Sequence, residues 1–104
     1  METTMSMQDV INRLTTELTI PISRPKIYHY DRKGVFGTIT RGEWGDRRFT
    51  EEDYGKVKVG LLLSELKLKT KDIAQVLNEG YDDELMSTLK MKKKVVQYLI
   101  NELA

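Results

Sequence analysis

The sequence predicts a mainly α-helical domain that carries one small β-hairpin. Two observations lead to this fold class. Apolar side chains recur at helical spacing in successive segments, and most of these segments open with a residue that favours a helix start. Between the second and third segments lies a stretch of β-prone residues and glycines, 35–49, which is typical of two short strands joined by a turn. The length of 104 residues corresponds to one domain.

The first helix is expected over about residues 6–18. Ser6 and Asp9 have the spacing of a capping box, with Asp in place of the usual Glu. Pro21 ends this helix, because proline has no N–H to donate and disfavours helix in the residue before it. The apolar face of the helix is predicted to consist of Met7, Val10, Ile11, Leu14 and Leu18.

A second, shorter helix is expected from residue 24 to about residue 33. Ser23 is placed to act as its N-cap, and Pro25 falls in the first turn, where a missing N–H has no consequence. Gly34 is suited to the left-handed conformation that ends many helices.

Two further helices are expected after the hairpin, capped by Thr50 and by Thr70. Gly55 and Gly60 lower the helical propensity of the third helix and predict close packing or local weakness near them. The inward face of the third helix is predicted to consist of Tyr54, Val57, Leu61, Leu62 and Leu66. The fourth helix is predicted to pack through Ile73, Val76 and Leu77 and to end at Gly80.

A last helix is expected from about Asp82. Its apolar residues are spaced four and three apart, which indicates a coiled-coil seam with one polar member, Lys92. Packing of this helix back onto its own domain is the alternative to dimerisation. We expect dimerisation through Leu85, Leu89, Val96, Leu99 and Leu103. The chain would then consist of a domain over residues 1–80 and a C-terminal dimerisation helix over residues 81–104.

Composition excludes several classes of function. The chain has no cysteine and one histidine, so it offers no disulfide framework, thiolate nucleophile or multi-histidine metal site. No nucleophile–base pair and no phosphate-cradling glycine loop is recognisable, so we expect a protein that is not an enzyme and uses neither cofactor nor metal. No apolar run approaches the roughly 18 residues of a membrane span, and the N-terminus does not have the pattern of a signal peptide. A cytoplasmic protein without membrane contact is expected.

Positive charge is concentrated in the segment that holds the second helix and the hairpin. The net charge of the chain is only +1, but residues 23–49 carry seven Lys or Arg against three acids, a net charge of +4. Two short helices, a tight break and a following hairpin are the element order of a winged helix-turn-helix, in which the second helix enters the major groove of DNA. The candidate DNA-binding residues are Ser23, Arg24, Lys26, Tyr28, His29, Tyr30, Lys33, Arg41, Trp44, Arg47 and Arg48.

Two of these candidates have equally simple structural interpretations. Trp44 would also be explained by packing of the hairpin on the third helix. Arg47 would also be explained by an ion pair with Asp46 or Glu51.

Two blocks of the sequence resemble the DNA-binding part of the MerR family of bacterial transcription regulators. Residues 23–36, SRPKIYHYDRKGVF, are similar to the family stretch S-V-R-T-I-R-Y-Y-E-R-x-G-L-L, and residues 45–53, GDRRFTEED, are similar to G-Y-R-x-Y-[ST]-E-E-D. Residues 61–77 resemble the family's third and fourth helices, so the resemblance covers about residues 20–78. It implies a dimer, and the last helix stands where the family has its dimerising antiparallel coiled coil.

Four positions depart from the family pattern, and the first helix is longer than the family's. His29 stands where the family has the first tyrosine of its pair, so the family's phosphate contact carries over only to Tyr30. Tyr28 replaces an arginine, Asp46 replaces the tyrosine of the hairpin, and Lys67 replaces a glycine. The family's sensor domain and its metal-sensing cysteines are absent from the sequence.

The leading functional hypothesis is a sequence-specific, dimeric double-stranded DNA-binding protein that regulates transcription, of bacterial, phage or plasmid origin. It would read an inverted repeat and would have RNA polymerase or another regulator as a further partner. One variant of this hypothesis is an architectural factor of the excisionase type. The alternative class is a protein-interaction module, such as an antirepressor or inhibitor, on the same fold.

Overall fold

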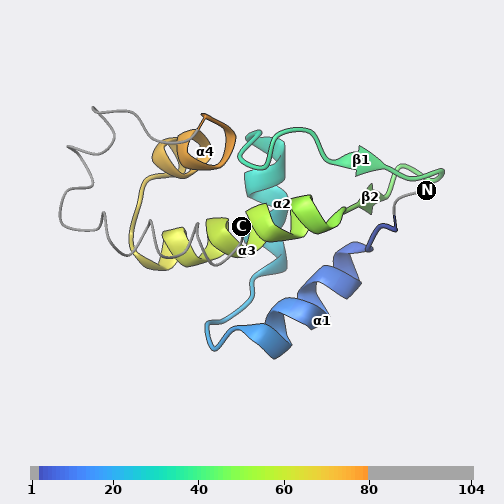
Figure 1. The fold of residues 1–104 in the computed structure, drawn as a ribbon, viewed down its shortest axis with the longest axis horizontal. Helices are drawn as coiled ribbons and strands as arrows, with labels where there is room; N and C mark the ends of the chain where they lie inside the picture. The colour runs from blue at the N-terminus through green and yellow to red at the C-terminus, as the bar shows by residue number, and fades with distance from the viewer. Residues whose placement is uncertain (1–2, 80–104) are drawn as a thin grey trace.

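The computed structural model describes residues 3–79, which fold into four helices and a two-stranded hairpin (Figure 1). The elements are α1 (Met7–Glu17), α2 (Arg24–Arg32), β1 (Thr40–Arg41), β2 (Arg47–Arg48), α3 (Glu51–Glu65) and α4 (Thr70–Glu79). This order confirms a mainly α-helical fold with a small antiparallel hairpin between the second and third helices. The predicted last helix, its seam residues and Gly80 lie outside the described residues.

The predicted helix starts are confirmed for the first three helices. In α1, the Ser6 side chain accepts a hydrogen bond from the backbone of Asp9, and the Asp9 carboxylate accepts one from the backbone of Ser6. Thr50 and Asp53 form the same reciprocal box at the start of α3. α4 begins at Thr70 itself, one residue earlier than a Thr70 cap would place it.

α2 and α3 end in the same way, but with different residues in the left-handed position. Gly34 has φ +73°, and the Val35 N–H donates to the Tyr30 carbonyl, which satisfies an end carbonyl of α2. At the end of α3, Lys67 has φ +65°, and the Leu68 N–H donates across the turn to the carbonyl of Leu63. The left-handed conformation of Lys67 occurs where the resembling family has glycine.

α3 lies at the centre of the described fold, with the other helices arranged around it (Figure 1). The predicted inward residues Tyr54, Val57 and Leu61 are buried. Gly60 is also buried, and a Cβ added there would lie 3.1 Å from Phe36, so the expected close packing at this glycine is confirmed. The largest fully buried side chains are Phe36, Phe49, Leu14, Ile27, Leu63 and Ile73. Within residues 3–79, no helix is long and apolar enough to cross a membrane.

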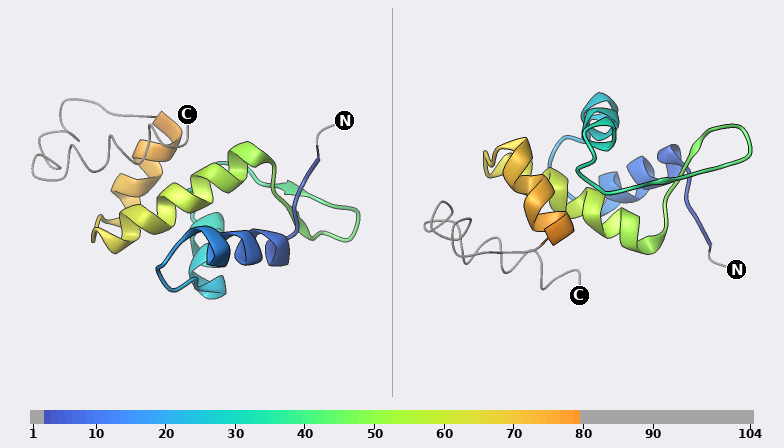
Figure 2. Two further views of the ribbon diagram at one scale, coloured as in Figure 1. Left: turned by 60° about the horizontal axis from the view of Figure 1, so that its bottom comes forward. Right: turned by 90° about the horizontal axis from the view of Figure 1, so that it is seen from above.

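The hairpin is joined by a third extended segment that the sequence did not predict. β1 and β2 pair Thr40 with Arg48 and Arg41 with Arg47. Beyond them, the Met5 and Phe49 backbones exchange two hydrogen bonds of 2.7 and 2.8 Å. The segment before α1 therefore lies beside the base of the hairpin, whose tip projects away from the helices (Figure 2).

Candidate nucleic-acid interface

Asp31 joins α2 to both strands of the hairpin. It is the one acidic residue of this otherwise basic helix, and its side chain is only 5% exposed. One carboxylate oxygen, Oδ2, accepts a hydrogen bond from Arg47 Nε at 2.5 Å and another from Arg41 Nη2 at 3.2 Å. A single buried carboxylate thus faces two guanidinium groups, so this cluster keeps an excess of one positive charge.

Tyr28 holds the same Arg47 guanidinium from a second side. The guanidinium carbon lies 4.4 Å from the centre of the Tyr28 ring, and the Arg47 side chain is 20% exposed. Ion pairs of Arg47 with Asp46 or Glu51, which the sequence left open, do not form in the described part of the chain. Asp46 Oδ2 lies 3.8 Å from Arg48 Nη1, and the Glu51 carboxylate pairs with Arg13.

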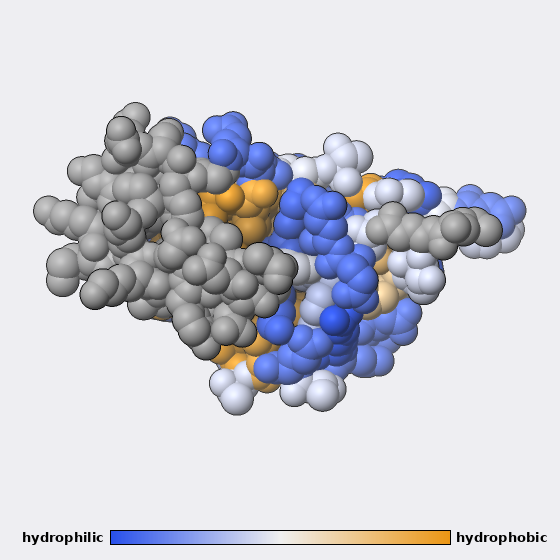
Figure 3. All heavy atoms as spheres, viewed as in Figure 1, coloured by the Kyte–Doolittle hydropathy of each residue, from blue (hydrophilic) through white to orange (hydrophobic). Residues whose placement is uncertain are grey.

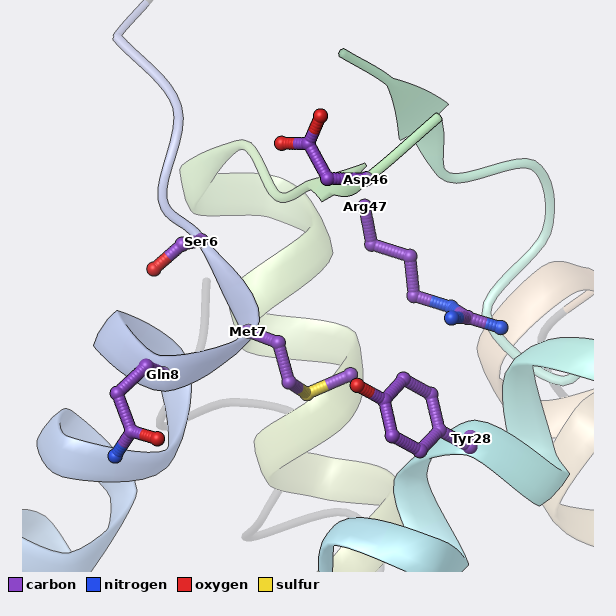
Figure 4. Close-up of a pocket in the computed structure, with 6 residues that line it drawn as sticks. All are labelled: Ser6, Met7, Gln8, Tyr28, Asp46 and Arg47. Atoms are coloured by element: carbon purple, nitrogen blue, oxygen red, sulfur yellow. The ribbon is translucent and has the colours of Figure 1, made fainter. Parts of the chain in front are cut away.

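The start of α1 meets α2 and the hairpin at a shallow pocket of about 260 Å³ (Figure 4). In this view the side chains of Arg47 and Tyr28 approach one another, while Asp46 points away from them. The pocket is lined by Ser6, Met7, Gln8, Tyr28, Asp46 and Arg47.

Gln8 connects this pocket to the start of α2, because its side-chain oxygen accepts a hydrogen bond from Arg24. We call Arg24, Tyr28, Asp31, Arg41 and Arg47 the α2–hairpin face. It has three guanidinium groups against one carboxylate, a net charge of +2.

The other predicted site residues of α2 are either engaged in contacts within the fold or exposed. Ser23 and Tyr30 serve the fold: the Ser23 hydroxyl accepts from the Lys26 N–H, and Tyr30 is 5% exposed, with its ring edge-on to Phe36. Lys26 is half-buried and donates from Nζ to Ser64 on α3 at 3.0 Å.

Two predicted site residues, His29 and Lys33, are exposed. His29 lies in the second half of α2, and Lys33 lies at its end.

The remaining hairpin candidates differ in how far the fold engages them. Arg48 donates to the Thr4 hydroxyl at 3.1 Å and to the Thr4 carbonyl at 3.2 Å, so it ties the hairpin to the N-terminal segment. Trp44 is 89% exposed, so it does not pack on α3. Hydrophilic residues cover much of the face that runs from α1 to the hairpin (Figure 3).

A second arginine–tyrosine cluster lies between α1 and α3. The Arg13 guanidinium lies 4.0 Å from the centre of the Tyr54 ring and pairs with Glu17 and with Glu51, both at 2.7 Å. Lys58 pairs with Glu17 at 2.8 Å. Two cations and two carboxylates balance, so this cluster, which we call the α1–α3 network, has no excess charge.

Two pKa values are strongly perturbed in the α1–α3 network. Hydrogen bonds from Lys58 and Arg13 lower the pKa of Glu17 to about 2. Burial, reinforced by the negative charge of Glu17, raises the pKa of Tyr54 well above its usual range. The Tyr54 hydroxyl is buried and has no hydrogen-bond partner among residues 3–79.

Three residues that contact the candidate DNA-binding residues were not among the predicted site residues. Asp31 could have been identified from the sequence, because it is the only acid in a basic helix and stands three residues after Tyr28. No sequence pattern points to Gln8 or Thr4, because their partners Arg24 and Arg48 belong to other elements.

Neither the described side chains nor similarity to known proteins gives a further indication of function. Within the described range 3–79, no group of three or more His, Cys, Asp or Glu side chains is placed to hold a metal ion. No family model matches the chain, and no curated protein or solved structure matches it either.

Proposed function

We propose that the protein binds double-stranded DNA through the α2–hairpin face, as a winged helix-turn-helix protein of the MerR type. The observation that carries this proposal is the Asp31 cluster, in which one buried carboxylate orients two guanidinium groups. Fixed guanidinium groups with an excess of positive charge suit the phosphate backbone, because they donate directed hydrogen bonds and displace counterions.

The position of α2 supports a division of labour within this surface. A major groove about 12 Å wide admits one helix. Arg24 and Tyr28 lie on the first half of α2, where docking helices of this kind contact base edges. Arg41 and Arg47 of the hairpin would then contact phosphates and fix the register, because phosphate contacts position a protein without reading sequence.

The biological role that follows is regulation of transcription by a dimer on an inverted repeat. The order of the elements and the resemblance of residues 20–78 support it. Dimerisation would use the predicted helix over residues 81–104. We favour a repressor or an architectural factor, with RNA polymerase or another regulator as a protein partner.

The test is selection of duplexes from a random library by the full chain at low salt, followed by fluorescence anisotropy on the recovered duplex. We expect Arg47→Ala and Arg24→Ala to weaken binding at least tenfold, since each removes a charged contact. Arg47→Ala should also reduce the slope of log K against log salt concentration by about 0.9, the value for one lost phosphate contact.

Lys71→Ala is the matched control, because it removes one exposed positive charge from α4, away from the α2–hairpin face. It should leave the affinity within about twofold, and circular dichroism should show all three variants folded. Recovery of no duplex at low salt would contradict the proposal and favour the protein-interaction alternative. Equal losses in all three variants would show that only total charge matters, which also contradicts an interface at α2 and the hairpin.

A further inference from the structure

We infer that the hairpin tip inserts Trp44 into the minor groove next to the main contact, at a step that contains a G·C pair, with Glu43 accepting a hydrogen bond from the guanine amino group. This inference rests on the proposed DNA binding. It goes further by naming the class of flanking sequence that the hairpin selects and the two residues that select it.

The tip is a three-residue loop that presents Glu43 and Trp44 at its apex. The Gly42 N–H donates to the Asp46 carbonyl at 2.6 Å, and the Gly45 N–H donates to the Gly42 carbonyl at 3.0 Å. Gly45 has φ +77°, the left-handed conformation that three-residue hairpin loops require. The loop is therefore closed by its own backbone, and its two apical side chains are left for other contacts.

Trp44 is the large apolar side chain that the described part of the molecule leaves to solvent. It is 89% exposed on a hairpin that projects from the helices (Figure 2). A Cβ added at Gly45 would meet no atom of a more distant residue within 4 Å, so the loop is not packed against another segment at this position. A flat, accessible ring on a projecting hairpin suits stacking between bases, and apolar wedges that enter the minor groove act in this way.

The anchoring of the hairpin sets the groove that its tip reaches. Asp31 fixes both strands to α2 through Arg41 and Arg47. With α2 in the major groove and these guanidinium groups on the adjoining phosphates, the tip extends across the backbone toward the minor groove.

The charge of the tip restricts the sequence that it tolerates there. Glu43 is exposed and has no ion pair within residues 3–79, whereas Asp46 is turned toward Gly42 and Arg48. In the minor groove, A·T pairs present only acceptors, and the guanine N2 amino group is the donor that a carboxylate can use. Glu43 therefore disfavours A·T pairs in the minor groove and accepts a hydrogen bond from the guanine N2 amino group.

The experiment uses the full chain, a selected duplex and the intrinsic fluorescence of Trp44, the only tryptophan in the sequence. Anisotropy of a dye on the DNA measures binding separately from tryptophan emission. We expect the duplex to quench Trp44, Trp44→Ala to weaken binding roughly tenfold through lost stacking, and Trp44→Phe to retain most of the affinity.

Base analogues test the proposed role of Glu43 without altering the major groove. Inosine in place of the flanking guanine removes the N2 amino group and should weaken binding several-fold, whereas 2,6-diaminopurine in place of a flanking adenine adds the group and should strengthen it. Glu43→Gln should abolish both effects, because an amide can also donate to the acceptors of A·T pairs.

The outcomes separate this inference from the proposed function. If the duplex binds without quenching Trp44, and the Trp44 variants bind it with unchanged affinity, the tip does not enter DNA and the inference is overturned. The tip would then be available to a protein partner. If stacking is observed but inosine binds as well as guanine, the assignment of Glu43 is overturned. If no duplex binds at all, the proposed function itself fails.

Discussion

Two arginines of this protein lie over tyrosine rings, and the charges around them differ. Arg13 covers Tyr54 at 4.0 Å, and Arg47 covers Tyr28 at 4.4 Å. In the α1–α3 network around Arg13, two carboxylates balance two cations. On the α2–hairpin face, the two guanidinium groups of Arg41 and Arg47 share the one carboxylate of Asp31.

The α1–α3 network links two helices, whereas the α2–hairpin face is the surface that we propose binds DNA. Carboxylates satisfy the guanidinium group of Arg13, and its contacts link α1 to α3. Arg47 contacts one ring and one carboxylate, and the positive charge of its cluster is only half neutralised. The two clusters share an arginine over a tyrosine ring, and they differ in the number of carboxylates, which leaves an excess of positive charge only on the α2–hairpin face.

The largest effect on stability is expected at Asp31. Asp31→Asn leaves Arg47, which is only 20% exposed, without its anion and should reduce the free energy of unfolding by about 1–3 kcal/mol. Glu51→Gln, the corresponding change in the α1–α3 network, should change it by less than about 0.5 kcal/mol, because Glu51 is 71% exposed. Urea denaturation of both variants measures the difference; a larger loss at Glu51 would reverse the comparison.

A smaller and opposite effect is expected at Tyr54. Its hydroxyl is buried near the Glu17 carboxylate but makes no hydrogen bond of standard geometry among the described residues, so Tyr54→Phe removes a poorly satisfied group and keeps the ring under Arg13. We expect a gain in the free energy of unfolding of up to about 1 kcal/mol. Tyr28→Phe, at a half-buried ring, should have almost no effect. A clear loss of stability in Tyr54→Phe would indicate that the hydroxyl makes an important hydrogen bond.

A further effect should appear only in acid. The pKa of Glu17 is lowered from 4.5 to about 2, so the folded state prefers the ionised carboxylate. The stabilisation from Glu17 is therefore complete above about pH 4.5 and is lost as the pH falls toward 2. Thermal melts between pH 6 and pH 2 should show a shallower decline for Glu17→Gln than for the unaltered protein. Parallel declines would show that Glu17 does not contribute.

The helices were predictable because their determinants are local. Ser6 and Asp9 are three residues apart, and the reciprocal capping box needs only that spacing. Gly34 ends α2 in the conformation that glycine favours. The Met5–Phe49 bridge was not predictable, because one backbone pair between distant segments leaves no periodic pattern in either.

The candidate site was predictable in its residue types but not in its connections. Basic and aromatic residues of α2 and the hairpin were identified, yet the partner of Arg47 depends on how the hairpin lies over α2. The sequence left Asp46 and Glu51 as candidates, and the fold brings Asp31 instead. The surroundings of Trp44 likewise depend on the direction in which the hairpin projects, which no local pattern determines.

The most direct test of the central claim compares the two stacked arginines in DNA binding. Arg47→Ala and Arg13→Ala each remove one guanidinium group from a tyrosine ring, so they match in chemistry and in lost charge. Anisotropy titrations of the selected duplex over a range of salt concentrations should show a slope reduced by about 0.9 for Arg47→Ala and an unchanged slope for Arg13→Ala. Equal slopes for both folded variants, or a greater loss for Arg13→Ala, would contradict an interface on the α2–hairpin face.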